Sequence, residues 1–227
     1  FYSYEAMDAA LVGNTVTDSI LYGFDPHDRS TRLLMAENHI TGTRERHGII
    51  VSREVNNSYI QHNYLEGNTR SGIMLERSST HNVVAYNESY NNGTDGIALY
   101  ESQDNLVYGN HVRGNLKSGI LLRNSWGVDV VGNTIYGDGS SNAQYGIYMR
   151  STHGNINGNS LTDADGGIYV ASIRGGLDFH MKDNFVTQSG RAVDGGYGIW
   201  VQNCGGGTVW LADNEVHVYD QAFETNN

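Results

Sequence analysis

The chain repeats itself about every 24 residues. An Asn followed by a short apolar segment returns at intervals of 23 to 26 residues, with a final interval of 30; these residues are Asn14, Asn38, Asn63, Asn87, Asn110, Asn133, Asn159, Asn184 and Asn214. A second series, in which Gly is followed by apolar, any and apolar residues, runs in phase with the first. It starts at Gly48, Gly72, Gly96, Gly119, Gly146, Gly167 and Gly198, and Gly23 fits the same frame. A repeat of this length favours an architecture of stacked units.

The segments between these marker residues are short, rich in β-branched residues and alternating, which indicates strands rather than helices. The Leu ladder of leucine-rich repeats is absent. Two or three short strands per rung predict an all-β parallel β-helix, with rungs stacked at about 4.8 Å. A β-sandwich or propeller is the alternative, and the two phase-locked series disfavour it. We expect residues 1–227 to form a single parallel β-helix domain that lacks N-terminal rungs, because the pattern is already under way at Phe1.

Alternation along a strand predicts which side chains point outward. After each Gly the first and third residues are apolar and should face the core, whereas the second and fourth should face solvent. The stretch that follows Gly23 contains Pro26, the only proline in the chain. In this frame Phe24 and Pro26 point inward, and Asp25 and His27 point outward with Cα atoms roughly 6.5–7 Å apart. We expect the fixed φ of Pro26 to orient both neighbours at the expense of one ladder hydrogen bond.

Positive charge gathers on this outward face, although the net charge of the chain is −11. Stacking the rungs in register predicts a basic stripe that consists of His27, Arg53, Arg70, Arg77, Arg123 and Arg150, with Arg46 and His47 on a preceding turn. A stripe with one residue per rung suits an extended anionic chain, and Tyr and Trp residues beside it would stack on sugar rings. The alternative is a solvated face in which the arginines pair with Glu76 and Glu101. The net charge disfavours general nucleic-acid binding, and no apolar run approaches the length of a membrane span.

The residues around the proline carry groups that can move a proton. On a polyuronate, Arg53 would neutralise the sugar carboxylate, and His27 would remove the adjacent proton as a neutral imidazole. Tyr22 would then return a proton, with Asp25 lining the same subsite. Return to the opposite face is epimerisation, whereas loss of the 4-O substituent is elimination, so an epimerase and a lyase stay open. A hydrolase would need two carboxylates across the bond, and alternation separates Asp25 from Asp28 if the strand continues.

Three stretches resemble the catalytic region of alginate (mannuronan) C5-epimerases, most closely the periplasmic bacterial form. They read YGFDPHDRS (22–30), RERHGIIVSREVNNSYI (44–60) and DGIALYESQDN (95–105). The likeness is strong from Phe1 to about Asn124, and beyond Gly137 it continues only as the general repeat. The resemblance implies a right-handed parallel β-helix that converts β-D-mannuronate to α-L-guluronate within the polymer.

The resemblance also implies roles for individual residues. His27 matches the catalytic base, Arg53 the residue that neutralises the carboxylate, Asp25 the motif acid, and Tyr22 the tyrosine proposed as acid or base. Arg70 lies where the secreted epimerases have a substrate-binding arginine. From the outward face itself, the expected substrate-binding residues are Arg46, Arg70, Arg77, Tyr100, Arg123 and Arg150.

We therefore expect an isomerase that is periplasmic or secreted and acts on an anionic polysaccharide, polymannuronate or alginate. We expect no metal, no cofactor, no nucleic acid and no insertion into a membrane. An alginate export complex is a further expected partner. A non-catalytic, polysaccharide-binding β-helix in such a complex is the alternative from another functional class.

Overall fold

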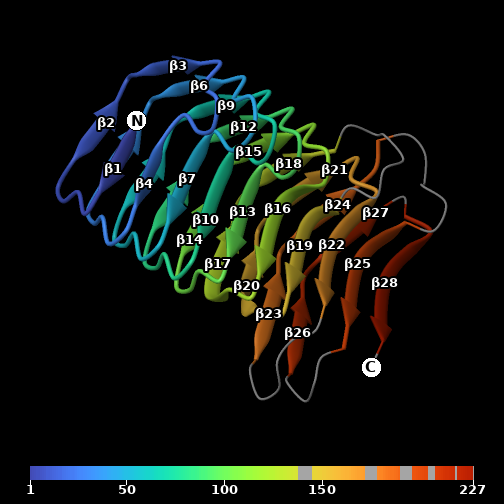
Figure 1. Ribbon diagram of the computed structural model, residues 1–227. Coiled ribbons are helices and arrows are strands. Elements are labelled where there is room, and N and C mark those ends of the chain that lie inside the picture. Colours follow the sequence, from blue (N-terminus) through green and yellow to red (C-terminus); the bar gives the residue numbers. More distant parts are fainter. Residues whose placement is uncertain (138–144, 172–177, 190–195, 204–207, 218, 227) are drawn as a thin grey trace.

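The protein is described by a computed structural model that covers residues 1–227 except 138–144, 172–177, 190–195, 204–207, 218 and 227. The chain winds into one elongated coil of stacked rungs, a parallel β-helix (Figure 1). All strand pairs in the described residues are parallel, as the 24-residue repeat predicts. Among the residues that the structure describes, no helix could cross a membrane.

Every third strand joins the same sheet, so the rungs build three long parallel sheets. The first sheet contains β1 (Tyr2–Tyr4), β4 (Asp25–His27), β7 (Ile49–Ser52), β10 (Ile73–Glu76), β13 (Ile97–Tyr100), β16 (Ser118–Arg123), β19 (Tyr145–Arg150), β22 (Gly166–Ala171), β25 (Tyr197–Gln202) and β28 (Gln221–Asn226). The second contains β2 (Ala10–Val12), β5 (Leu34–Ala36), β8 (Tyr59–Gln61), β11 (Val83–Ala85), β14 (Leu106–Tyr108), β17 (Trp126–Val131), β20 (His153–Asn157), β23 (Phe179–Lys182) and β26 (Val209–Ala212). The third contains β3 (Thr15–Thr17), β6 (His39–Thr41), β9 (Tyr64–Glu66), β12 (Glu88–Tyr90), β15 (His111–Arg113), β18 (Thr134–Tyr136), β21 (Ser160–Thr162), β24 (Phe185–Thr187) and β27 (Glu215–His217).

The register of the first sheet confirms the frame read from the sequence. The first and third residues after each Gly, such as Ile73 and Leu75, are fully buried in the central core. The second residues form a separate apolar row on the outer face of the sheet, which consists of Ile50, Met74, Ala98 and Leu121. Phe24 belongs to the core and Pro26 is buried, so the proline does fill an inward position. The outer face therefore carries the second and fourth side chains of each rung, but the expectation that they face solvent is wrong for the apolar row and for His27, which are buried on that face.

The repeating Asn residues form a ladder between the second and third sheets. The Nδ2 atom of Asn63 donates to Oδ1 of Asn87 at 2.9 Å and to the carbonyl oxygen of Met35 at 2.9 Å. The same oxygen of Asn87 accepts the backbone N–H of Asn63 at 3.0 Å. Each buried amide thus satisfies groups on neighbouring rungs, which explains why Asn returns at this turn.

The repeating Gly residues mark a close approach between rungs. A Cβ atom at Gly96 would lie 2.3 Å from Cγ1 of Val112 and 2.7 Å from the carbonyl oxygen of Gly119. Neither gap accommodates a Cβ atom, so the residue that precedes strand β13 must be Gly.

Candidate functional site

A cleft of about 520 Å³ lies on the outer face of the first sheet, over β4, β7, β10 and β13. Its lining includes all four residues expected to be catalytic and four of the six expected to bind substrate, namely Tyr22, Asp25, His27, Arg53, Arg46, Arg70, Arg77 and Tyr100. The other two, Arg123 and Arg150, line a neighbouring cavity of about 280 Å³ that shares Asp95 and Tyr100 with the cleft. The structure therefore brings the predicted residues together along one face.

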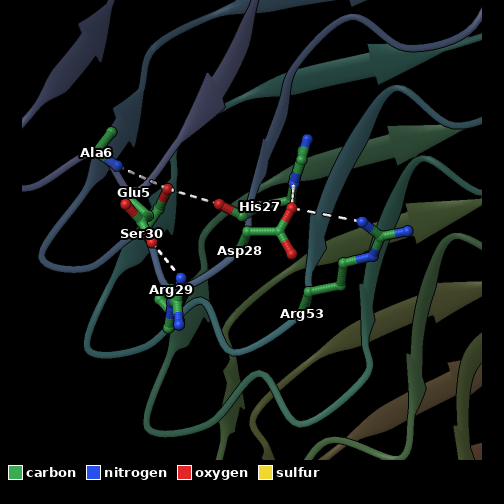
Figure 2. Close-up of polar contacts among 7 residues, drawn as sticks. All are labelled: Glu5, Ala6, His27, Asp28, Arg29, Ser30 and Arg53. Carbon is green, nitrogen blue, oxygen red and sulfur yellow. Dashed lines mark hydrogen bonds and ion pairs between the residues drawn. The ribbon is translucent and has the colours of Figure 1, made fainter.

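His27 ends strand β4 and is held in one orientation within the cleft. The residue is 7% exposed, and its Nδ1 atom pairs with Oδ2 of Asp28 (Figure 2). The ring of Tyr2, one rung away, packs edge to face against it at 4.5 Å between centroids. With Nδ1–H directed to the carboxylate, the lone pair of the neutral ring lies on Nε2. The arrangement is that of an oriented proton acceptor.

Asp28 is a member of the site that the sequence analysis missed. Alternation separates Asp25 from Asp28 only if the strand continues, but β4 ends at His27, and Asp28 has a left-handed φ of 48°. This turn brings the Asp28 carboxylate beside the imidazole, and the same Oδ2 atom lies 3.4 Å from Nη1 of Arg53 (Figure 2). The repeat contained a signal for this turn, because the residue that follows the strand is polar in successive rungs. In the structure the backbone of that residue has a left-handed φ at Arg53, at Arg77 and in later rungs.

The walls of the cleft hold further ionisable groups in altered states, among them Asp25 and His47. Burial raises the pKa of Asp25, against the opposing effects of His27 and Arg53. Burial, followed by the charges of Arg70 and Arg46, lowers the pKa of His47 to about 4. His47 is therefore a neutral residue of the wall.

The neutral His47 ring has two defined contacts. It lies parallel to the ring of Tyr22 at 6.2 Å between centroids. Its Nδ1 atom accepts the backbone N–H of Ser71 at 3.2 Å. These contacts hold the His47 ring beside the Tyr22 ring at the wall of the cleft.

The alternative of internally paired arginines holds for two members of the stripe, Arg53, which pairs with Asp28, and Arg77. Nε of Arg77 lies 3.4 Å from Oε1 of Glu76, so this arginine is partly neutralised. Within the described residues, no ion pair at or below 4.0 Å involves Arg46, Arg70, Arg123 or Arg150. Three of the six stripe residues, Arg70, Arg123 and Arg150, are thus cations that are available to an anionic ligand, as is Arg46 on the preceding turn.

Three aromatic residues further along this face, Tyr148, Tyr169 and Trp200, stack on one another. The ring of Tyr169 lies between Tyr148, at 5.1 Å and 16°, and Trp200, at 4.4 Å and 22°. The rung spacing of about 4.8 Å is close to a stacking distance, so side chains in register stack on one another. The Tyr169 ring therefore has an aromatic ring against each of its two faces.

The comparisons with known proteins begin with a family model. The model described as periplasmic copper-binding protein (NosD) matches residues 38–184. The family description names copper, but within the described residues no group of three or more His, Cys, Asp or Glu side chains is arranged to hold a metal ion. The described residues therefore do not fit a copper site.

The curated relatives are mannuronan C5-epimerases, whereas solved structures of lower identity share only the fold; one of these is an alginate lyase of Paenibacillus, which matches with a TM-score of 0.75 at 15% identity, over 95% of this chain and 78% of that one. The chain is similar to mannuronan C5-epimerase of Pseudomonas aeruginosa, with 46% identity over 198 residues, 87% of this chain and 33% of that protein. The crystal structure of the periplasmic alginate epimerase AlgG matches with a TM-score of 0.67 and 34% identity, over 95% of this chain and 47% of that one. The A-module of mannuronan C-5 epimerase AlgE4 of Azotobacter vinelandii, at 20% identity, shares the fold with a TM-score of 0.83, over 96% of this chain and 62% of that one.

These matches extend the resemblance and also limit its reach. An alignment of 198 residues necessarily continues past Asn124, so the similarity runs further along the chain than the quoted stretches indicate. The chain spans about a third of the length of the curated relatives that it matches.

Proposed function

The chain belongs to the family described as periplasmic copper-binding protein (NosD) and is a homologue of mannuronan C5-epimerases, and from this premise we propose that it inverts C5 of β-D-mannuronate within polymannuronate or alginate. The product is α-L-guluronate in an intact chain. One observation carries the proposal: His27, which the Asp28 carboxylate orients, and the cation Arg53 line the same cleft. The relatives that are named as periplasmic support the same location for this chain. Assembly with an alginate export complex stays a prediction.

In the proposed reaction, Nε2 of His27 takes the C5 proton. Asp28 holds the opposite edge of the ring, which fixes the tautomer and stabilises the imidazolium that forms. Asp28 thus acts through His27 and is a positioning residue. Proton abstraction by a positioned side chain contributes on the order of 10²–10⁴-fold to the rate.

Loss of the C5 proton adds negative charge to a group that is already a carboxylate. Arg53 lies at the rim of the cleft, with its guanidinium near Asp28 and half exposed to solvent. Such a side chain can reach a substrate carboxylate and stabilise the developing charge. The Asp28 carboxylate therefore links the base to the cation that stabilises the intermediate.

Return of the proton from the other face completes the inversion. Tyr22 lines the cleft with a phenol that can donate it, and Asp25 accepts hydrogen bonds from the sugar in the same subsite. Neighbouring uronates are held by the remaining lining residues, which are Arg46, Arg70, Arg77 and Tyr100. Bidentate binding by arginine suits a carboxylate on each sugar.

The test is incubation with polymannuronate in deuterated water. Epimerisation produces guluronate signals with deuterium at C5, whereas a lyase produces unsaturated ends that absorb in the ultraviolet, and a binding protein produces neither. His27→Ala should abolish C5 exchange and keep the fold. The matched control is His111→Ala, which removes an exposed histidine from the third sheet. Substantial turnover by His27→Ala would exclude His27 as the base.

A further inference from the structure

The second cavity, over β16 and β19, has its own set of cationic and phenolic groups. It is lined by Lys117, Arg123 and Arg150 together with Tyr145 and Tyr148, and it encloses about 280 Å³. It opens beside the catalytic cleft, because Asp95 and Tyr100 line both. The two spaces follow one another along the outer face of the same sheet.

We propose that this cavity is a distal subsite for a carboxylate-bearing sugar of the same polyuronate chain that lies over His27. The nature of the polymer rests on the proposed function. His27 is on β4, and the arginines are on β16 and β19, four and five strand positions along the sheet. The chain must therefore cross about 19–24 Å to occupy both sites.

The two arginines favour an anion between them. Arg123 and Arg150 occupy aligned positions on paired strands, so two like charges stand one rung apart. Like charges in such positions destabilise a sheet, and a carboxylate that binds both removes that repulsion. Cζ of Arg123 lies 5.6 Å from the centre of the Tyr100 ring, an arrangement that holds the guanidinium at the boundary between the two spaces.

The tyrosines suit a carboxylate better than the apolar face of a sugar. Tyr148 aligns with Leu121 on one side and stacks on Tyr169 on the other, so its two ring faces are covered. What remains is the ring edge, which carries the positive end of the aromatic quadrupole, and the hydroxyl. The phenol of Tyr145 beside it is protonated at neutral pH and can donate a hydrogen bond, and burial raises its pKa further. Cations, ring edges and phenol hydroxyls all favour negative charge.

A second site on the same chain changes the dependence on chain length. Once one sugar lies over His27, binding at the distal site becomes intramolecular and gains effective concentration without a new encounter. Long chains gain from it, and chains that are too short to span the distance do not. The distal subsite therefore makes the protein selective for polymer over short oligomer.

The experiment compares polymannuronate with trimannuronate for the wild-type chain and the double variant Arg123→Gln/Arg150→Gln. The ratio of kcat/KM for polymer to kcat/KM for trimer should fall about tenfold or more in the variant, because the avidity term is lost. Tyr148→Phe, which keeps the stack and removes one hydroxyl, should lower the ratio less. Retardation of the protein in gels that contain polymannuronate gives a second readout that needs no turnover, and the double variant should lose most of it.

Arg113→Gln is the matched control, since Arg113 is an exposed arginine on β15 of the third sheet, and it should leave the ratio and the retardation at their wild-type values. An unchanged ratio together with unchanged retardation in the double variant would overturn the distal subsite. Failure of the proposed function looks different: the wild-type chain then epimerises neither substrate, while retardation still reports whether Arg123 and Arg150 hold the polymer.

Discussion

Oδ2 of Asp28 pairs with Nδ1 of His27, although the two residues are neighbours in sequence and the strand alternation would place them on opposite faces. The left-handed backbone of Asp28 makes this contact possible by ending β4 at the histidine. The consequence is that the base is oriented from within its own rung, whereas the cation Arg53 comes from the next. A short motif thus supplies both the base and the group that positions it.

Asp28→Asn should lower kcat on the order of 10²–10⁴-fold, because losing the carboxylate that orients a histidine base removes much of what the base contributes. An amide can offer its N–H to Nδ1 and so favour the wrong tautomer, with the proton on Nε2. Nitrogen NMR of the histidine side chains would measure that change directly. Asp104→Asn, an exposed residue with a similar φ of 53°, is the control and should change neither kcat nor the tautomer. Wild-type kcat in Asp28→Asn would remove Asp28 from the mechanism.

Pro26→Val should keep the fold and reduce activity. Ile50 donates to the carbonyl of Phe24 at 2.9 Å, but proline has no N–H for the next position of the β4–β7 ladder. Valine would restore that hydrogen bond, which stabilises the folded protein by about 0.5–1.5 kcal/mol. It would also raise the conformational entropy of the unfolded chain, which destabilises the folded protein by about 0.4–1 kcal/mol. The two effects nearly cancel, so the unfolding midpoint should hardly move.

The freed φ at position 26 should let His27 sample other orientations, and kcat should fall severalfold at unchanged KM. Denaturant unfolding and steady-state kinetics on the same preparation separate the two effects. Wild-type kcat in Pro26→Val would show that the proline is incidental to orientation.

The sequence predicted which residues of successive rungs lie side by side, because the repeat length places equivalent residues at aligned positions. The strands of the first sheet from β4 to β25 each carry the same kind of Gly at or just before their start, so aligned pairs such as Glu76 with Tyr100 followed from counting. Alternation stops where the backbone turns left-handed, and the Asp28 contact lies at such a place. The buried state of His47 was also beyond the pattern, since it depends on which side chains from neighbouring rungs cover a turn. The self-stacking of Tyr169 depends on ring orientation, which spacing alone does not determine.

Asn87→Ala should destabilise the coil more than its single side chain suggests. Asn87 Nδ2 donates to the carbonyl of Ile60 at 2.8 Å and to Oδ1 of Asn110 at 3.0 Å, and its own oxygen accepts from Asn63. Each buried partner left without a hydrogen bond costs about 1–3 kcal/mol. Urea unfolding should show a loss of at least that size, whereas Asn14→Ala, at the exposed end of the same ladder, should cost much less. Equal losses at the two positions would argue against the ladder as a source of stability.

Two buried groups in the cleft should give the free energy of unfolding opposite dependences on pH. His47 has a folded pKa of about 4 against an ordinary value of 6.5, so its contribution is present above pH 6.5 and is lost as the pH falls towards 4. Burial raises the pKa of Asp95 from 3.8 to about 6, so its contribution is present at low pH and is lost as the pH rises through 6. Each shift corresponds to about 3 kcal/mol, so the two largely cancel between pH 4 and 6.

Replacing either group alone should therefore give a free energy of unfolding that depends on pH more steeply than that of the wild-type protein between pH 4 and 6. His47→Gln keeps an acceptor for the Ser71 N–H and removes the titration, so its stability relative to wild type should rise as the pH falls from 7 to 4. Asp95→Asn should gain on wild type as the pH rises through 6, because no charge is then formed in the buried site. Urea unfolding at several pH values measures both differences, with the exposed His111→Gln as the control for the loss of a histidine. Parallel pH profiles for the wild type and both variants would contradict the assignment, because neither group would then titrate differently in the folded and unfolded chains.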